Sequence, residues 1–444
     1  MRRFTTFKID HPEDFRKRFF NWAGNLPISC VLDSNDYAGR YPHSFARHSY
    51  ELLAGTGCLK NLTLADREWQ KALDKFLSES NDWIFGHVGY DLKNEIEDLT
   101  SSHPDRIDFP LIYFFVPEYV FIIKKNILEI GWHSEVTNSD DVASVIKEII
   151  TYPLPEADRP SVSGINEVIP ETDYLRAVEK IMEHIRKGDI YEVNFCLEFL
   201  AEKAIIDPVS TWIRLIEESP TPFSCFYRIN DKYLLCASPE RFLKKTGNMI
   251  YSQPIKGTSA RGTTLQDDRF AREALRNDPK ERAENIMITD LVRNDLSKIA
   301  SKGSVKVNEL CGIYPFPRVY QMQSDISAEL SGKTDFSRIL ESTFPMGSMT
   351  GAPKMKAMEI IEQYEKSRRG LYSGTVGYFT PGLDFDFNVV IRSIQYNRAE
   401  ECLSFMVGGA ITNQSIPVRE YQECMLKAGA VFKVLGLESH LSST

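Results

Sequence analysis

Several features that mark secreted, membrane-bound and nucleotide-binding proteins are missing from this 444-residue sequence. Its eight cysteines are scattered without a CxxC pair, a distribution that predicts neither a zinc site nor a disulfide framework. No apolar run is long enough to span a membrane, and the basic N-terminus lacks the apolar segment of a secretory signal. The absence of GxGxxG and Walker loops removes two common phosphate-binding signatures. We therefore expect a reduced, cytoplasmic protein.

Positive charge is also scarce. With 53 Lys and Arg against 62 Asp and Glu, the net charge is −9, which argues against non-specific binding to nucleic acid or anionic lipid. Hydrophobic content of 42% and charged content of 26% are typical of a soluble globular protein. The length allows one large two-part domain or two to three ordinary ones.

A proline-rich, polar segment at residues 151–172 is the best candidate for a linker. It separates an N-terminal region, 1–155, from a larger C-terminal domain, 165–440. In the first region, residues 111–132 predict two adjacent strands with a lysine pair at the turn. Residues 83–92 predict a strand whose glycines allow close backbone approach.

The second part of the sequence alternates long helices with strands that contain glycine. Thr172 is a candidate N-cap for a helix that ends at Gly188. Residues 372–380, 384–396 and 402–411 predict an antiparallel meander. Strands in hairpins beside segregated helices favour an α+β fold over a doubly wound sheet.

One lysine has a restrained backbone. Lys256 lies in QPIKGTSARG (253–262), between Pro254, which fixes one backbone angle, and Gly257, which allows a close approach. If the site desolvates this amine, its pKa falls and it becomes a nucleophile or base near neutral pH. The alternative is a solvated surface lysine, as most lysines are.

Two predicted helices each present a pair of glutamates. Asp278 is the candidate N-cap of the first, in which Glu281 and Glu284 share a face. A second helix, opened by a proline, carries Glu420 and Glu423 on one face. Brought together, the four carboxylates would make a hard oxygen site suited to Mg²⁺. The alternative is a helix cap and ordinary solvated helix faces.

Seven segments of the second part carry a family resemblance: SPERF (238–242), PIKGTSARG (254–262), KERAENIMITDLVRNDLSKI (280–299), FPMGSMTGAPKMKAMEIIEQYE (344–365), RRGLYSGTVGY (368–378), DFDFNVVIRS (384–393) and GGAITNQSIPVREYQECMLKA (408–428). Together they resemble the chorismate-utilising enzymes, which include the component I chains of anthranilate synthase and aminodeoxychorismate synthase and the isochorismate and salicylate synthases. The resemblance covers most of residues 170–435 and is looser in the N-terminal part. It implies the anthranilate synthase component I-like, chorismate-binding α+β fold, with antiparallel sheets packed as a sandwich and helices on the outside.

Details within the motifs select among the branches of this family. Lys256 is similar to the lysine of aminodeoxychorismate synthase component I, where anthranilate synthases usually have alanine. Glu192 stands where isochorismate and salicylate synthases carry a water-activating lysine, so the hydrolytic branches are not expected. The resemblance thus implies conversion of chorismate and ammonia to 4-amino-4-deoxychorismate, for 4-aminobenzoate and folate synthesis. Anthranilate synthase component I, or a non-catalytic homologue that binds chorismate, are the alternatives.

The resemblance also implies a role for each matching residue. Lys256 attacks C2 of chorismate, and Glu240 protonates the departing C4 hydroxyl. Arg392 binds the enolpyruvyl carboxylate, for which a planar fork is suited. The other residues implied to line the pocket are Gly257, Thr258, Ser348, Tyr372, Gly408, Ala410 and Lys427.

For the metal, the resemblance implies that Glu284 and Glu423 bind Mg²⁺ directly and that Glu281 and Glu420 hold metal-bound waters. One position departs from the family pattern, because Gln321 replaces a histidine. Gln321 can orient a hydroxyl group or ammonia through hydrogen bonds, but it cannot transfer protons.

The sequence contains no recognisable glutamine amidotransferase segment. Ammonia must therefore come from solution or from a separate glutaminase subunit, and we expect a heterodimer that forms near the ammonia entrance of the pocket. In this family, residues like those of VLDS (31–34) can line an amino-acid pocket in the N-terminal part.

Overall fold

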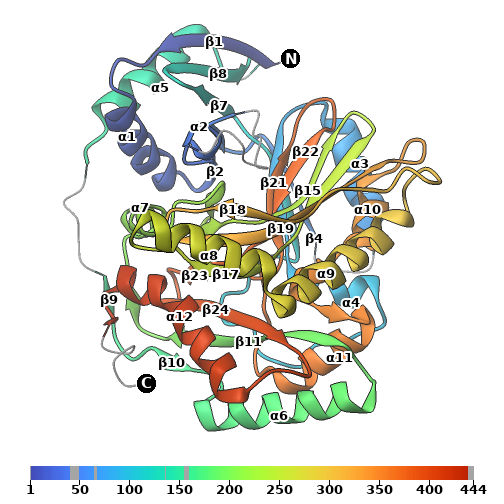
Figure 1. Ribbon diagram of the computed structural model, residues 1–444. Helices are drawn as coiled ribbons and strands as arrows, with labels where there is room; N and C mark the ends of the chain where they lie inside the picture. The colour runs from blue at the N-terminus through green and yellow to red at the C-terminus, as the bar shows by residue number, and fades with distance from the viewer. Residues whose placement is uncertain (1, 41–49, 65–67, 136, 155–159, 439–444) are drawn as a thin grey trace.

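The computed structural model describes residues 2–40, 50–64, 68–135, 137–154 and 160–438 (Figure 1). Most of its helices lie on the outside of two large sheets. The helices are α1 (Pro12–Asn25), α2 (Tyr37–Arg40), α3 (Trp69–Ser80), α4 (Lys93–Ile96), α5 (Ser139–Thr151), α6 (Glu171–Lys187), α7 (Pro208–Glu218), α8 (Leu265–Asn277), α9 (Pro279–Ser297), α10 (Phe336–Thr343), α11 (Lys354–Tyr364) and α12 (Pro417–Leu435), with the 3-10 helices η1 (Tyr90–Leu92) and η2 (Gly347–Met349).

Within these residues the first sheet has twelve strands. Its order is β1 (Arg2–Lys8), β8 (Ile127–His133), β7 (Tyr119–Lys124), β3 (Leu52–Thr56), β2 (Ile28–Asp33), β13 (Phe223–Ile229), β14 (Lys232–Ser238), β23 (Ser393–Asn397), β24 (Cys402–Ile411), β11 (Glu192–Ala201) and β10 (Asn166–Glu167), and β20 (Gly351–Ala352) also pairs with β11.

The second sheet has ten strands in the same part of the chain. Its order is β17 (Ile255–Ala260), β19 (Val319–Glu329), β16 (Met249–Gln253), β15 (Arg241–Thr246), β22 (Phe385–Asn388), β21 (Thr375–Phe379), β5 (Ile84–Val88), β6 (Ile112–Val116) and β4 (Lys60–Leu64), and β18 (Lys306–Pro315) also pairs with β19. The short strands β9 (Ser161–Val162) and β12 (Ala204–Ile205) form a separate pair.

Both large sheets join strands from the two parts of the sequence. In the first sheet, β2 pairs antiparallel with β13, and in the second sheet β5 pairs antiparallel with β21. On its other side β5 packs closely against β6 at Gly86, where an added Cβ would lie 2.1 Å from the backbone oxygen of Tyr113. The division of the chain into regions 1–155 and 165–440 stays a prediction.

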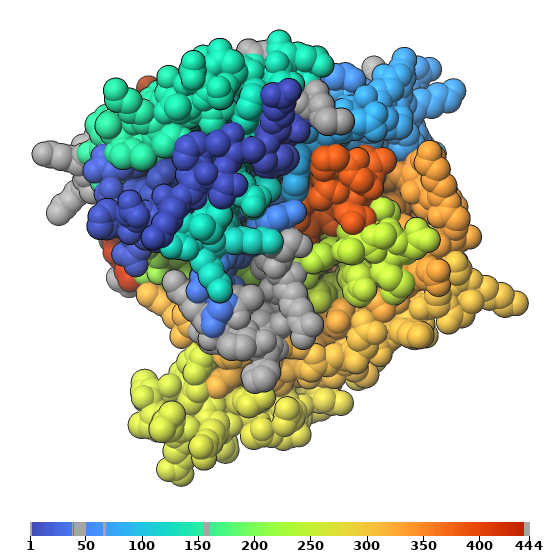
Figure 2. All heavy atoms as spheres, turned by 90° about the horizontal axis from the view of Figure 1, so that it is seen from above, coloured from blue at the N-terminus to red at the C-terminus, as the bar shows by residue number. Residues whose placement is uncertain are grey.

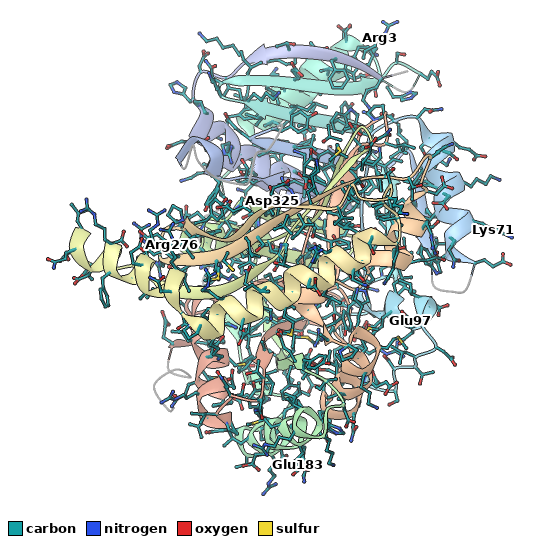
Figure 3. The ribbon with its side chains drawn as sticks, turned by 45° about the vertical axis from the view of Figure 1, so that its right-hand side comes forward. Arg3, Lys71, Glu97, Glu183, Arg276 and Asp325 are labelled. Atoms are coloured by element: carbon teal, nitrogen blue, oxygen red, sulfur yellow. The ribbon has the colours of Figure 1, made fainter. Side chains whose placement is uncertain are left out.

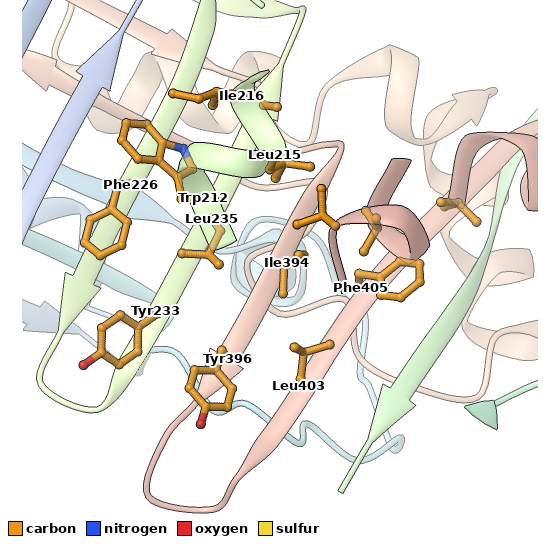
Figure 4. Close-up of a cluster of buried hydrophobic side chains, with 14 of the residues drawn as sticks. Trp212, Leu215, Ile216, Phe226, Tyr233, Leu235, Ile394, Tyr396, Leu403 and Phe405 are labelled. Atoms are coloured by element: carbon orange, nitrogen blue, oxygen red, sulfur yellow. The ribbon is translucent and has the colours of Figure 1, made fainter. Parts of the chain in front are cut away.

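The predicted α+β fold with two large antiparallel sheets is confirmed, and the core explains the layering. Alternate residues of one strand enter different clusters: Leu52 packs with the outer helices of the first sheet, whereas Leu53 packs between the sheets. Such alternation is what a strand buried on both faces requires. Figure 4 shows part of the outer cluster, where Trp212 and Leu215 of α7 cover β13, β14 and β23.

Helix α8 is the main exception to this compact packing. It projects from the body of the molecule in the view from above (Figure 2), and Arg276 lies on the projecting part (Figure 3). Leu265 and Phe270 of this helix are exposed. Among the described residues, no helix has the length and apolar character needed to cross a membrane.

Several helix boundaries follow the predicted caps. Asp278 caps α9, where its side chain accepts hydrogen bonds from the backbone N–H groups of Lys280 and Glu281. Gly188 ends α6 in the left-handed conformation, as predicted, but the helix begins at Glu171, and Pro170 rather than Thr172 is its N-cap. Proline already fixes the backbone angle that a first turn needs, so the expected threonine cap is not used.

Two of the strand predictions are wrong because each expects neighbouring strands in one sheet where the structure has strands of both sheets. Residues 111–132 form three strands, of which β7 and β8 make the hairpin with the lysine turn, while β6 belongs to the other sheet. The expected meander is two separate hairpins, because β21 and β22 lie in the second sheet and β23 and β24 in the first. The chain passes from one sheet to the other at residues 389–392.

Candidate active site

The candidate nucleophile lies on a strand that helix α9 covers. Lys256 is on β17, and its carbonyl oxygen accepts a hydrogen bond from the amide of Asn285 on α9 at 3.2 Å. The same amide donates to the carbonyl of Met322 on β19, also at 3.2 Å. The next residue, Gly257, has a φ of +102°, and an added Cβ would lie 3.0 Å from Oε2 of Glu281. Only glycine fits this conformation and this close approach readily.

The side chain of Lys256 is surrounded by carboxylates. Its Nζ lies 3.2 Å from Oε1 of Glu192, and the two side chains are 11% and 1% exposed. Burial acts to lower the pKa of Lys256, but Glu192, Glu284 and Glu240 together raise it above its ordinary value. The expectation of a lowered pKa is therefore wrong for the substrate-free protein, because neighbouring charge outweighs desolvation. Lys256 rests as an ammonium group.

The candidate acid is buried and accepts hydrogen bonds from a hydroxyl group and from the backbone of Ile255. Oε1 of Glu240 accepts a hydrogen bond from Oγ of Ser348 at 2.7 Å, and Glu240 is 4% exposed. Burial raises the pKa of this carboxyl to about 7, although Ser348 and Lys256 act to lower it. A carboxylic acid with such a pKa can donate a proton near neutral pH. Its carbonyl accepts the backbone N–H of Val389 at 3.0 Å, which ties the acid to the crossing between the sheets.

Helices α9 and α12 bring the two glutamate pairs together around another lysine. Nζ of Lys280 lies 3.8 Å from Oε1 of Glu284 and 3.9 Å from Oε1 of Glu420. Glu281 and Glu423 contribute to the field at the same ammonium group, and all four glutamates raise its pKa despite partial burial. The predicted meeting of the two pairs is thus present in the fold.

These carboxylates have the chemistry of a magnesium site. Burial raises the pKa of Glu284 to about 7, and its buried Oε1 accepts no hydrogen bond from the residues described. Burial also raises the pKa of Glu281 and Glu420. Within the described ranges, no three acidic, histidine or cysteine side chains already have ligand geometry for one ion. The donor set nevertheless fits Mg²⁺, because carboxylate oxygens from two facing helices are the hard ligands that this cation prefers.

Arg392 lies at the crossing between the sheets with a φ of +50°. Burial lowers the pKa of its guanidinium, and no carboxylate opposes that effect. The guanidinium makes no hydrogen bond or ion pair with the part of the chain that the structure describes. A partly buried guanidinium without an anion is suited to bind a carboxylate of a ligand.

Strand β24 and helix α12 form another side of the site. Nζ of Lys427 donates to the carbonyl of Gly408 at 2.8 Å and pairs with Oε1 of Glu423 at 2.7 Å. Gly409 lies between Gly408 and Ala410, and a Cβ added to it would lie 3.7 Å from Oε2 of Glu420. Gly409, between the two predicted residues, therefore faces the glutamates of α12, whereas Gly408 and Ala410 occupy the alternate positions, and a Cβ on Gly408 would meet Cys196.

The remaining predicted residues fall on the same strands or beside them. Tyr372 is buried, with its hydroxyl 4.0 Å from Sγ of Cys196, which lies opposite Gly408 in the sheet. Thr258 is exposed and pairs in register with Gln321 of β19. Gln321 is 2% exposed, and its Oε1 accepts no hydrogen bond within the described residues. That oxygen is free to accept one from a ligand.

A partly open pocket borders β2 and β22, and its lining includes Ser34, Tyr50 and Asn388. The predicted N-terminal pocket near Ser34 is therefore present. A second partly open pocket borders the candidate acid and is lined by residues that include Glu240, Ser348 and Asp295.

Three residues around the site are not among those predicted. Glu192 enters the sequence argument only as a departure from other branches of the family, because its pairing with Lys256 depends on strand packing. Asn285 lies within a family motif that indicates no role for it. The spacing of Lys280 and Glu284, four residues apart on one helix, could have signalled their ion pair.

Comparison with known proteins gives a consistent result. The family model described as chorismate binding enzyme matches residues 34–433. Aminodeoxychorismate synthase component 1 of Bacillus subtilis (strain 168) is 33% identical over 441 residues, which cover 96% of this chain and 91% of that protein. Anthranilate synthase component 1 of Thermus thermophilus is 32% identical over 359 residues, covering 79% of this chain and 77% of that protein.

Solved structures agree on the fold. The crystal structure of anthranilate synthase component I from Streptococcus pneumoniae TIGR4 superposes with a TM-score of 0.75 at 24% identity. The match covers 88% of this chain and 95% of that chain. The curated relatives include both kinds of synthase, so their names alone leave the product open.

Proposed function

This chain belongs to the chorismate-binding enzyme family, and we propose that it is the aminodeoxychorismate synthase component I that makes 4-amino-4-deoxychorismate from chorismate and ammonia. The product would serve 4-aminobenzoate and folate synthesis. The observation that carries the proposal is the placement of Lys256, a buried amine among carboxylates, in the same site as an acid with a pKa of about 7. A mostly buried lysine beside a proton donor is suited to covalent catalysis.

The first half of the reaction joins Lys256 to the substrate. The amine forms a bond to C2 of chorismate, the electrons of the ring diene shift, and the C4–O bond breaks with its electron pair on oxygen. Glu240 gives that oxygen a proton, so that water leaves rather than hydroxide. In the second half, ammonia bonds to C4, the electrons shift back, and the C2–N bond to Lys256 breaks. Glu240 then recovers a proton from the new ammonium group.

Binding and orientation fall to the charged residues around the ring. Arg392 has a guanidinium free to hold the enolpyruvyl carboxylate. Glu281, Glu284, Glu420 and Glu423 would hold Mg²⁺, which when bound clamps the ring carboxylate and withdraws electrons from the ring. Ser348, Tyr372, Gln321 and Lys427 complete the pocket wall.

Ammonia is expected from a second chain. Both relatives named above are described as component 1 of their synthases, and this sequence shows no glutaminase motif. We therefore propose a glutamine amidotransferase partner that binds near the ammonia entrance. Glutamine-dependent activity by this chain alone, at the level seen with ammonium, would contradict the need for a partner.

Anthranilate synthase component I is the second candidate, because a relative with that activity is 32% identical. The two functions differ in the carbon that receives nitrogen. An amine from the protein at C2 leaves C4 for ammonia, whereas anthranilate requires ammonia itself at C2. Lys256 therefore favours aminodeoxychorismate.

The test is to identify the product by mass after incubation with chorismate, Mg²⁺ and ammonium. Wild type should form 4-amino-4-deoxychorismate, and Lys256→Ala should not. Anthranilate from the wild-type protein would overturn the proposal in favour of the second candidate. Unconsumed chorismate would indicate a protein that binds chorismate without converting it.

A further inference from the structure

Glu192 pairs with the candidate nucleophile inside the protein. It is the first residue of β11, it is 1% exposed, and its Oε1 lies 3.2 Å from Nζ of Lys256. Apart from this contact with Lys256, neither carboxylate oxygen accepts a hydrogen bond from the residues described. Glu198 on the same strand is hydrogen-bonded to Ser404. The side chain of Glu192, in contrast, has no polar contact with the described residues other than its ion pair with Lys256.

The proposed reaction gives this pair a task. Lys256 rests as an ammonium group, and an ammonium nitrogen has no electron pair with which to attack carbon. Its side chain is 11% exposed, so water has little access to remove a proton. Glu240 cannot take that proton, because it must itself be protonated to assist the departing hydroxyl. Glu192 already lies at a distance from which protons transfer directly.

We propose that Glu192 is a further catalytic residue, which accepts a proton from Lys256 and returns it at the end of each turnover. The inference rests on the proposed function. The ammonium group of Lys256 gives one proton to Glu192, and the neutral amine then bonds to C2. When ammonia has added at C4, the C2–N bond breaks and the electron pair returns to the lysine nitrogen. That nitrogen takes the proton back from Glu192, so the pair ends as it began.

A purely structural role predicts a different behaviour. If Glu192 only anchored Lys256, removing its negative charge would lower the pKa of the amine and increase the fraction of free nucleophile. Glu192→Gln, which keeps a polar group at the same place, would then leave the attack on C2 as fast as before, or faster. A proton acceptor and an anchor can therefore be told apart by the rate of the first covalent step.

The experiment follows that step alone. The full chain is mixed with chorismate and Mg²⁺ without ammonia, stopped at intervals, and examined by intact mass and by peptide mapping for an adduct on Lys256. Glu192→Gln keeps the volume of the side chain but cannot accept the proton. We expect it to form the adduct at least about 100-fold more slowly than wild type, the usual contribution of a general base. Glu198→Gln, which removes another buried carboxylate from β11, should form it at the wild-type rate.

Rescue by small anions tests whether position 192 must supply a proton acceptor or only a negative charge. In Glu192→Ala, acetate and formate should restore adduct formation, with the more basic acetate acting better. Chloride at equal ionic strength should not, since it supplies charge but does not accept a proton at this pH. If thermal unfolding shows that Glu192→Ala does not fold, Glu192→Gln is compared with Glu192→Asp, which shortens the carboxylate side chain. Only Glu192→Asp should then keep part of the wild-type rate of adduct formation.

Each outcome decides a different statement. Adduct formation by Glu192→Gln at the wild-type rate would overturn the role of Glu192 while leaving the proposed function intact. Rescue by chloride equal to that by acetate would reduce Glu192 to a source of charge and also overturn it. A wild-type protein that consumes chorismate without modifying Lys256 would refute the proposed covalent mechanism itself.

Discussion

The buried acid should weaken the folded protein at alkaline pH, and Glu240→Gln should remove that weakness. Burial raises the pKa of Glu240 from 4.5 to about 7. A folded-state pKa above the unfolded value means that the folded form binds the proton more tightly. The stabilisation that the protonated carboxyl of Glu240 gives to the folded protein is therefore complete below pH 4.5. It declines as the pH rises and is lost above pH 7. A difference of about 2.5 pKa units corresponds to roughly 3 kcal/mol.

Glutamine is neutral at every pH, so the variant carries no such penalty. Relative to wild type, Glu240→Gln should gain up to about 3 kcal/mol of unfolding free energy between pH 5 and pH 8, while it loses activity. Urea unfolding of both proteins at the two pH values measures this gain. The same substitution at the exposed Glu179 serves as the control and should give an equal difference at both pH values.

An equal stability difference at pH 5 and pH 8 for Glu240→Gln would refute the reasoning. Glu240 would then be an ordinary carboxylate, ionised well below neutral pH, and could not serve as the proton donor. The kinetic counterpart is a rate of adduct formation that falls above pH 7, because the protonated fraction of Glu240 declines there.

Four further predictions concern the groups around this acid. Ser348→Ala removes the hydrogen bond that lowers the pKa of Glu240, so the alkaline limit of adduct formation should move up by about one pH unit. Arg392→Lys, which loses the bidentate fork, should weaken chorismate binding about 10- to 100-fold by fluorescence titration, and unchanged binding would contradict its role. Lys280→Gln takes a cation from between four glutamates and should tighten Mg²⁺ binding about tenfold in calorimetry; weaker binding would show that Lys280 supports the site. Asn285→Ala removes the hydrogen bonds of this amide to the carbonyls of Lys256 and Met322 and should lower the unfolding free energy by about 2 kcal/mol.

The sequence was informative wherever local chemistry decides the structure. The caps of α9 and α12 follow from Asp278 and from the proline and glycine at the helix ends, and each helix then places its glutamates three residues apart. Family resemblance supplied the grouping of these helices with Lys256. The structure adds the distances between the side chains of these helices and their neighbours.

The sequence failed where the answer depends on distant residues. Turn signals between 372 and 411 indicate hairpins correctly, but no local pattern states to which sheet a hairpin belongs. The pKa of Lys256 was expected to fall because burial lowers it, and the carboxylate that reverses the direction lies on another strand. Predicting either feature requires knowing which strands pack together.

Each large sheet contains strands from both parts of the sequence, and this has a consequence for how the protein folds during its synthesis. β5 (Ile84–Val88) lies between β6 and β21 (Thr375–Phe379), so one of its edges stays open until the chain is almost fully synthesised. β2 waits less long for its partner, because β13 (Phe223–Ile229) lies near the middle of the chain. Pairings between segments so far apart form slowly, and exposed apolar edges invite association with other chains meanwhile. A nascent chain of this fold thus keeps one edge of β5 unpaired until its last quarter has emerged from the ribosome.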